Sequence, residues 1–178
     1  MRKVKFLLLL IAVLTNSCLT FYFEHPIPVD VKNTKRMPRA LKGEWKTEEG
    51  LLTINNTQWI SIITDSNGVV TRKVEYELSD SLILRKYKKN YFFNQLAENG
   101  YWNLYLGFET GTHFVIKRLG DDDTLTFKTT LGLLADSTTN EALYFQQPIT
   151  KRQIIKFIDG GGFSDTLFLF DLKNRVME

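Results

Sequence analysis

From Leu41 onwards, apolar and polar residues alternate along short runs, and this alternation constrains the fold more than any other feature of the chain. A period of two places one kind of side chain on each face of a β-strand. The runs are rich in β-branched and aromatic residues, and turn residues such as Asn67-Gly68 separate them. The sequence therefore predicts a mainly β domain, an antiparallel meander that closes into a barrel or folds as a two-sheet sandwich.

The separate runs predict individual elements. Strands are expected at 58–64, 70–78, 81–87, 91–96, 101–108, 112–119, 124–130 and 166–172. Before the last of them, Thr150 and Gln153 have the spacing of a capping box, and isoleucines then recur at helical spacing. We expect one C-terminal helix here, which ends at the glycines 160–162 and precedes the last strand.

The N-terminus has the pattern of a secretory signal. Basic residues precede an apolar run at 6–14, which is too short to span a bilayer, because a spanning helix needs about 20 apolar residues. Thr15-Asn16-Ser17 then leads to Cys18, the only cysteine of the chain. This pattern resembles the bacterial lipobox, which implies cleavage before Cys18 and attachment of acyl chains to its thiol. The alternative is an ordinary secretory signal with an incidental cysteine.

These patterns divide the chain into three parts. Residues 1–17 are the expected signal peptide, 18–40 a lipidated cysteine with an extended, proline-containing tether, and 41–178 a single β-rich domain. Three of the 23 basic residues leave with the signal, so the remaining 20 balance the 20 acidic residues. This balance excludes the basic surplus that nucleic-acid binding requires, and we expect no nucleic-acid partner.

Motifs for catalysis and metal binding are absent from the sequence. His25 and His113 belong to no metal-ligand pattern, and the glycines at 160–162 follow a predicted helix, whereas a phosphate loop precedes one. The aspartates at 121–123 predict a solvated hairpin tip, because adjacent strand residues point in opposite directions and cannot surround one Ca²⁺ ion. We predict no catalytic residue, no metal site and no cofactor.

Aromatic side chains are the remaining feature, and Trp45, Tyr76 and Trp102 lie on apolar strand faces. Most strand aromatics pack in a core, but they also line cavities for small apolar ligands. We predict that these three residues form a ligand-binding wall of a non-enzymatic module for a small apolar ligand or a partner protein. The alternative is a structural adaptor with a filled core, which docks an envelope protein. A hydrolase, with carboxylates brought together by the fold, is third.

Two resemblances add to these expectations. Gly43-Glu44-Trp45 resembles the Gly-x-Trp motif that opens the first strand of lipocalins, which implies a lipocalin-like barrel. Segments around Cys18, Tyr91-Phe92, Tyr101-Trp102 and Ile158-Asp159 look like those of uncharacterised small lipoproteins of Bacteroidota. The second resemblance implies a bacterial envelope protein, held at a membrane by its lipid and facing the periplasm.

Overall fold

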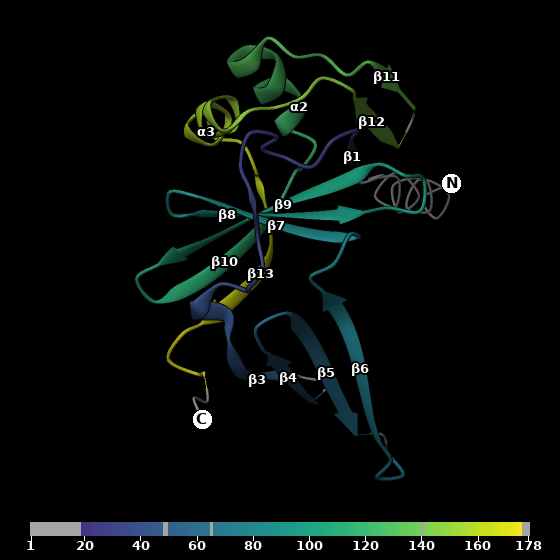
Figure 1. Ribbon diagram of the computed structural model, residues 1–178, viewed down its shortest axis with the longest axis vertical. Coiled ribbons are helices and arrows are strands. Elements are labelled where there is room, and N and C mark those ends of the chain that lie inside the picture. The colour runs from purple at the N-terminus through teal and green to yellow at the C-terminus, as the bar shows by residue number, and fades with distance from the viewer. Residues whose placement is uncertain (1–18, 48–49, 65, 140, 176–178) are drawn as a thin grey trace, which may run out of the picture.

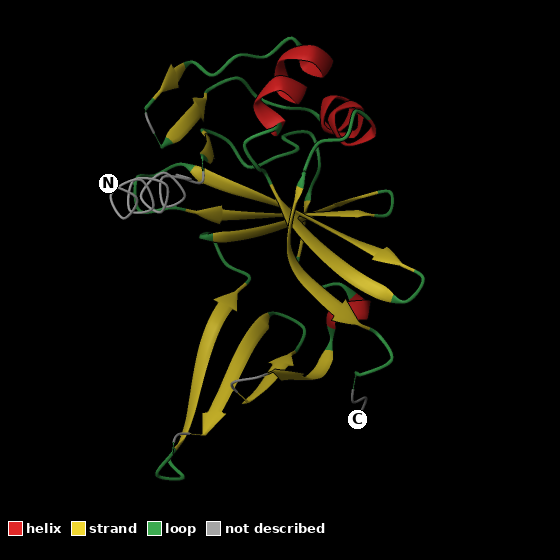
Figure 2. Ribbon diagram, turned by 180° about the vertical axis from the view of Figure 1, so that it is seen from behind, coloured by secondary structure: helices red, strands yellow, loops and turns green. Residues whose placement is uncertain are grey.

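The computed structural model describes residues 19–47, 50–64, 66–139 and 141–175, and its strands form two open sheets (Figures 1 and 2). The large sheet contains β1 (Thr20–Phe23), β2 (Asn33–Thr34), β7 (Leu82–Tyr87), β8 (Asn90–Leu96), β9 (Trp102–Thr110), β10 (His113–Arg118), β11 (Ser137–Thr138), β12 (Ala142–Phe145) and β13 (Asp165–Asp171). The small sheet contains β3 (Gly43–Thr47), β4 (Gly50–Ile54), β5 (Gln58–Thr64) and β6 (Val70–Glu77). The helical elements are the 3₁₀ turn η1 (Arg39–Leu41), α2 (Asp123–Thr126), the π-helical turn η2 (Phe127–Leu131) and α3 (Lys151–Asp159).

Both sheets contain antiparallel meanders, which confirms the prediction of a mainly β fold. Strands β3 to β6 pair in chain order, and so do β7 to β10. The predicted barrel is wrong, because the described strands of neither sheet close on themselves. One edge of β9 is shared by β10 and by β1, which meets β9 only at the Phe23–Trp102 pair. The large sheet therefore branches at β9.

Two hydrophobic cores hold the layers together. The first lies between the large sheet and the helices α2 and α3, which cover one end of the molecule (Figure 1). Its centre is a stack of aromatic rings in which Phe127 contacts Phe157 at 4.2 Å and Phe145 at 4.9 Å between ring centroids. The second lies between the small sheet and strands β7, β8, β10 and β13, and contains Trp45, Trp59 and Phe114.

Residues 19–40, for which the sequence predicts an extended tether, are folded onto the domain. β1 pairs in parallel with β12, and its Phe21 and Phe23 are only 4% and 1% exposed. Further along, the buried side chain of Asn94 accepts a hydrogen bond from the Ile27 N–H at 2.6 Å and donates one to the Ile27 carbonyl at 2.9 Å. Phe21, Phe23 and Ile27 thus belong to the first core and Met37 and Ala40 to the second, so the segment is not a free linker.

The segment 124–130 is helical and not the predicted strand. Asp123, Phe127 and Leu131 recur every four residues, which places all three on one side of the consecutive turns α2 and η2. The fold therefore has a second helical segment besides the predicted one. Asp123 is fully buried, so this aspartate does not belong to a solvated hairpin tip.

The helix α3 begins at the capping box. The Thr150 hydroxyl accepts from the Gln153 N–H at 3.4 Å, and the Gln153 side chain accepts from the Thr150 N–H at 2.9 Å. The strand after α3, β13, runs toward the small sheet and pairs with β10 (Figure 1). Within the described ranges, no helix has the length and apolar character needed to cross a membrane.

Candidate ligand-binding groove

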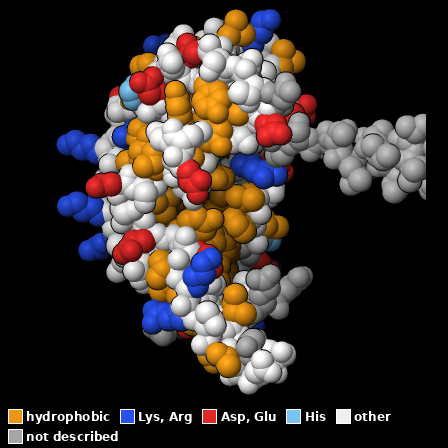
Figure 3. Space-filling model, turned by 90° about the vertical axis from the view of Figure 1, so that its right-hand side faces the viewer, with side chains coloured by type: hydrophobic (Ala, Val, Ile, Leu, Met, Phe, Trp, Pro, Cys, Tyr) orange, Lys and Arg blue, Asp and Glu red, His pale blue; other side chains and the backbone are white. Residues whose placement is uncertain are grey.

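An open groove lies between the small sheet and β13, and hydrophobic side chains gather in the hollowed band beside the small sheet (Figure 3). The groove has a volume of about 560 Å³. This volume is in the range of small-molecule sites, about 300–1,000 Å³. The lining comes from four strands of the small sheet and from β13: Trp45, Lys46, Thr47, Leu51, Leu52, Trp59, Ser61, Ile62, Ile63, Glu75, Tyr76, Phe168, Leu169 and Phe170.

Aromatic rings from the two sheets meet at the base of the groove. Trp59 of β5 lies 5.5 Å from Phe168 and 5.4 Å from Phe170 of β13, measured between ring centroids. Trp45 of β3 contacts Phe170 edge to face at 5.0 Å, and its indole N–H donates to the Leu41 carbonyl at 2.9 Å. These contacts fix the position of β13 relative to the small sheet and satisfy the buried indole donor.

β13 exposes three consecutive apolar side chains. Leu167, Phe168 and Leu169 are 37%, 39% and 62% exposed. The register shifts beside them, since Ile116 pairs with Phe168 and Lys117 with Thr166, which leaves Leu167 without a partner residue on β10. This bulge turns Leu167 toward the small sheet, where it lines a second hollow.

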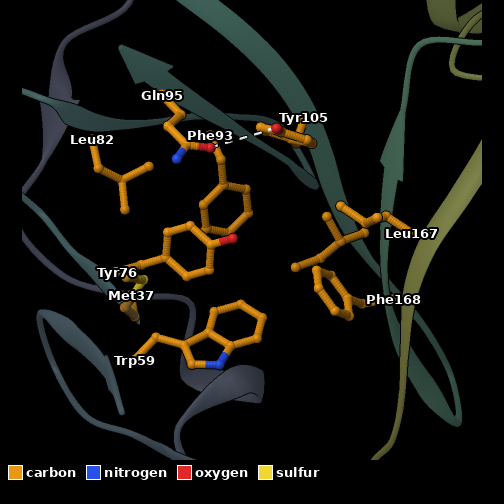
Figure 4. Close-up of a pocket in the computed structure, with 10 residues that line it drawn as sticks. Met37, Trp59, Tyr76, Leu82, Phe93, Gln95, Tyr105, Leu167 and Phe168 are labelled. Atoms are coloured by element: carbon orange, nitrogen blue, oxygen red, sulfur yellow. Dashed lines mark hydrogen bonds between the residues drawn. The ribbon is translucent and has the colours of Figure 1, made fainter. Parts of the chain in front are cut away.

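We call this second hollow, shown in Figure 4, the narrow hollow. Its volume is about 40 Å³. Phe93 and Tyr76 lie between Tyr105 at one end and Trp59 at the other, and Leu167 and Phe168 form the opposite wall (Figure 4). The remaining lining residues are Met37, Leu82, Gln95 and Ile116. Trp59, Tyr76 and Phe168 line both spaces, so the narrow hollow and the groove are neighbours.

Glu75 and Tyr105, which border these spaces, have shifted pKa values. The Glu75 carboxylate accepts hydrogen bonds from the Lys73 ammonium at 2.7 Å and the Ser61 hydroxyl at 2.6 Å, and these bonds lower the pKa of Glu75. Burial raises the pKa of Tyr105, with a smaller contribution from Tyr76. The Tyr105 phenol therefore stays neutral at physiological pH, and the narrow hollow keeps its apolar character.

The structure brings together two of the three residues of the predicted ligand-binding wall. Trp45 and Tyr76 both line the groove. Trp102 packs instead against the first core, where β9 meets β1 at Phe23. The lipidation site predicted at Cys18 lies outside the described residues.

Sequence reasoning missed the contribution of β13. Phe168, Leu169 and Phe170 were predicted to lie in a strand, but nothing in the sequence tells which sheet their side chains face. The composition of the strand does carry a signal for this contribution, because five residues in a row from Thr166 to Phe170 carry no charge. An uncharged apolar edge strand is unusual in a protein that leaves that edge open.

Elsewhere, Asp123 has a structural role. Its Oδ2 accepts hydrogen bonds from the Gly120 N–H at 2.8 Å and from the N–H and hydroxyl of Ser164, each at 3.0 Å. These bonds connect the start of α2 to the segment that leads into β13. In the part of the chain that the structure describes, no group of three or more His, Cys, Asp or Glu side chains is placed to hold a metal ion.

Comparisons of the chain with protein-family models, with curated proteins and with solved structures find no match.

Proposed function

We propose that the protein is a lipid-anchored envelope lipoprotein whose folded domain binds an apolar ligand, without catalysis, in the groove between the small sheet and β13. The groove carries this proposal, because it combines the volume of a small-molecule site with walls of aromatic and aliphatic side chains. The proposal places the anchor at Cys18 and the domain on the periplasmic side of a bacterial membrane, in accordance with the signal pattern.

The chemistry of the groove favours binding over hydrolysis. A hydrolase of the glycosidase type needs two carboxylates that face each other across the substrate. Among the described residues that line the groove, one, Glu75, has a carboxylate. This carboxylate accepts hydrogen bonds from Lys73 and Ser61. A carboxylate held in its charged form by two donors is a poor general acid.

A fluorescent apolar dye tests the binding proposal. Both cores are built from residues after Cys18, so the experiment uses the protein from Leu19 to Glu178 and N-phenylnaphthylamine as the dye. Leu169 in the groove is 62% exposed, and Leu134, outside it, is 63% exposed. We expect L169E to weaken dye binding by about ten-fold or more, which corresponds to about 1.4 kcal/mol, and L134E to leave it unchanged. Equal binding by all three proteins would refute the groove as the site.

A second candidate function, the docking of an envelope protein, is favoured by the free edge of β13. Among the described strands, β13 pairs only with β10, so no described strand covers its other edge, and its apolar side chains Leu167, Phe168 and Leu169 are exposed. An extended segment of a partner fits such an edge by strand addition. The variant T166K places a charge on this edge, so it is expected to abolish partner capture while N-phenylnaphthylamine binding persists.

A further inference from the structure

A third hollow adjoins the narrow hollow at the place where the described chain begins. It is lined by Leu19, Thr20, Phe21, Asn103, Leu104, Tyr105, Arg118 and Leu119, and we call it the N-terminal hollow. It lies where β10 and β1 diverge along the shared edge of β9. Tyr105 lines both the N-terminal hollow and the narrow hollow. Each space thus shares lining residues with the next, in the order N-terminal hollow, narrow hollow and groove.

The N-terminal hollow and the narrow hollow differ in polarity. The N-terminal hollow includes the polar side chains of Thr20, Asn103 and Arg118, and the Arg118 guanidinium is in a salt bridge with Asp165 at 2.6 Å. The narrow hollow is almost entirely apolar. A ligand that occupies the N-terminal hollow and the narrow hollow together therefore has a polar end near Leu19 and an apolar part beside Tyr105.

The narrow hollow also limits the shape of the ligand. Its volume of about 40 Å³ admits a slender group and excludes ring systems as large as the aromatic side chains that line it. A polypeptide does not suit it, because backbone N–H and C=O groups would lose their hydrogen-bond partners among these apolar side chains. An unbranched alkyl chain meets both conditions.

The position of the N-terminal hollow indicates the source of that chain. Leu19, which follows Cys18 directly, lines this hollow, and its N–H donates to the Asp121 carboxylate at 3.0 Å. With residues 20–23 in β1, little free chain separates the expected lipid on Cys18 from the hollow. We infer that the ligand is one acyl chain of a membrane phospholipid, whose headgroup lies at the N-terminal hollow. This inference rests on the proposed function, both on the groove as a ligand site and on lipidation of Cys18.

Photochemical labelling tests the inference on the whole protein. The full chain is expressed with its signal, extracted from membranes and reconstituted into vesicles of phosphatidylethanolamine and phosphatidylglycerol. A small share of the phosphatidylethanolamine carries a diazirine on one acyl chain. After irradiation, mass spectrometry of peptides locates the adducts. We expect adducts at Tyr76, Trp59 and Phe168, which line both the narrow hollow and the groove.

A blocking variant and a matched control accompany the wild type. L167W fills the narrow hollow from the bulge on β13, and L125W makes the same change on the exposed surface of α2. We expect L167W to lose the adducts beyond Tyr105 and L125W to keep them. If circular dichroism shows that L167W is unfolded, the positions of the adducts in the wild type alone test whether the acyl chain enters the narrow hollow.

Four results would overturn the inference. Adducts confined to exposed residues, and unchanged by L167W, mean that the phospholipid chain stays in the bilayer. Groove adducts that arise only when the diazirine is carried by the acyl chains on Cys18 mean that the protein holds its own anchor. If adducts are missing while N-phenylnaphthylamine still binds and responds to L169E, the apolar ligand site stands and only its assignment to phospholipid fails. Loss of both signals removes the proposed function as well.

Discussion

Trp59 on β5 and Phe168 on β13 are in contact at the base of the groove, with their ring centroids 5.5 Å apart, and join the small sheet to the large one. Because Phe168 is 39% exposed, its truncation leaves an open notch and not a closed cavity. We expect F168A to lower the free energy of unfolding by about 1–2 kcal/mol, less than the roughly 3–5 kcal/mol typical of a fully buried phenylalanine. Urea denaturation followed by tryptophan fluorescence measures this change. A loss above that range would mean that Phe168 is a core residue and not a groove wall.

Residues 19–40 are expected to be essential for folding. A protein that starts at Leu41 lacks Phe21, Phe23 and Ile27, all buried in the first core. We expect this protein to lack a cooperative thermal transition by circular dichroism, whereas a protein that starts at Leu19 unfolds cooperatively. Cooperative unfolding of both proteins at similar temperatures would show that this segment is a tether after all.

The Asn94 side chain is expected to be a larger source of stability than its size suggests. It is fully buried and pairs with both backbone groups of Ile27, so N94A leaves a buried N–H and a buried C=O without their partner. Since each such group costs about 1–3 kcal/mol, we expect a loss of about 2–5 kcal/mol in urea unfolding. The control is N99A, which removes an exposed hydrogen bond to the Tyr101 N–H and is expected to cost less than about 1 kcal/mol. Equal effects of the two variants would contradict this assignment.

Stability is expected to fall at alkaline pH because of Tyr105. Burial raises the pKa of its phenol in the folded state above the ordinary value of about 10. The folded protein therefore holds this proton more tightly than the unfolded chain does. The contribution of the protonated Tyr105 phenol to the free energy of unfolding is complete below a pH of about 10 and is lost as the pH rises through the folded-state pKa. Urea midpoints measured across this range should fall less steeply for Y105F than for wild type. Parallel curves would show that Tyr105 does not titrate in this range.

Local patterns predict the elements whose own side chains determine them. β5 has the predicted bounds, Gln58–Thr64, because its run of β-branched and aromatic residues lies between two runs of turn residues. The segment 124–130 was misassigned because its threonines favour a strand locally, while burial of Phe127 against Phe157 favours a helix. Contacts with distant residues decided that case, and a local pattern does not contain them.

The groove depends still more on such distant contacts. Tyr76 was predicted as a wall residue from the alternation of β6, and Trp45 from that of β3. The opposite wall comes from β13, about 100 residues further along the chain, and its side chains reach the groove through the pairing of β13 with β10. Neither that pairing nor the bulge at Leu167 leaves a local signal, and Trp102 was misplaced because its alternation does not tell which core its face meets.

Native mass spectrometry of the whole protein, extracted from bacterial membranes in a mild detergent, tests the central claim most directly. The wild type is predicted to lack residues 1–17, to carry acyl chains on Cys18, and to retain a non-covalently bound apolar molecule that L169E releases and L134E keeps. The variant C18A is predicted to carry no acyl chain. A wild type without acyl chains would contradict the anchor. A wild type without a bound molecule, or with one that L169E and L134E retain equally, would contradict the groove as a ligand site.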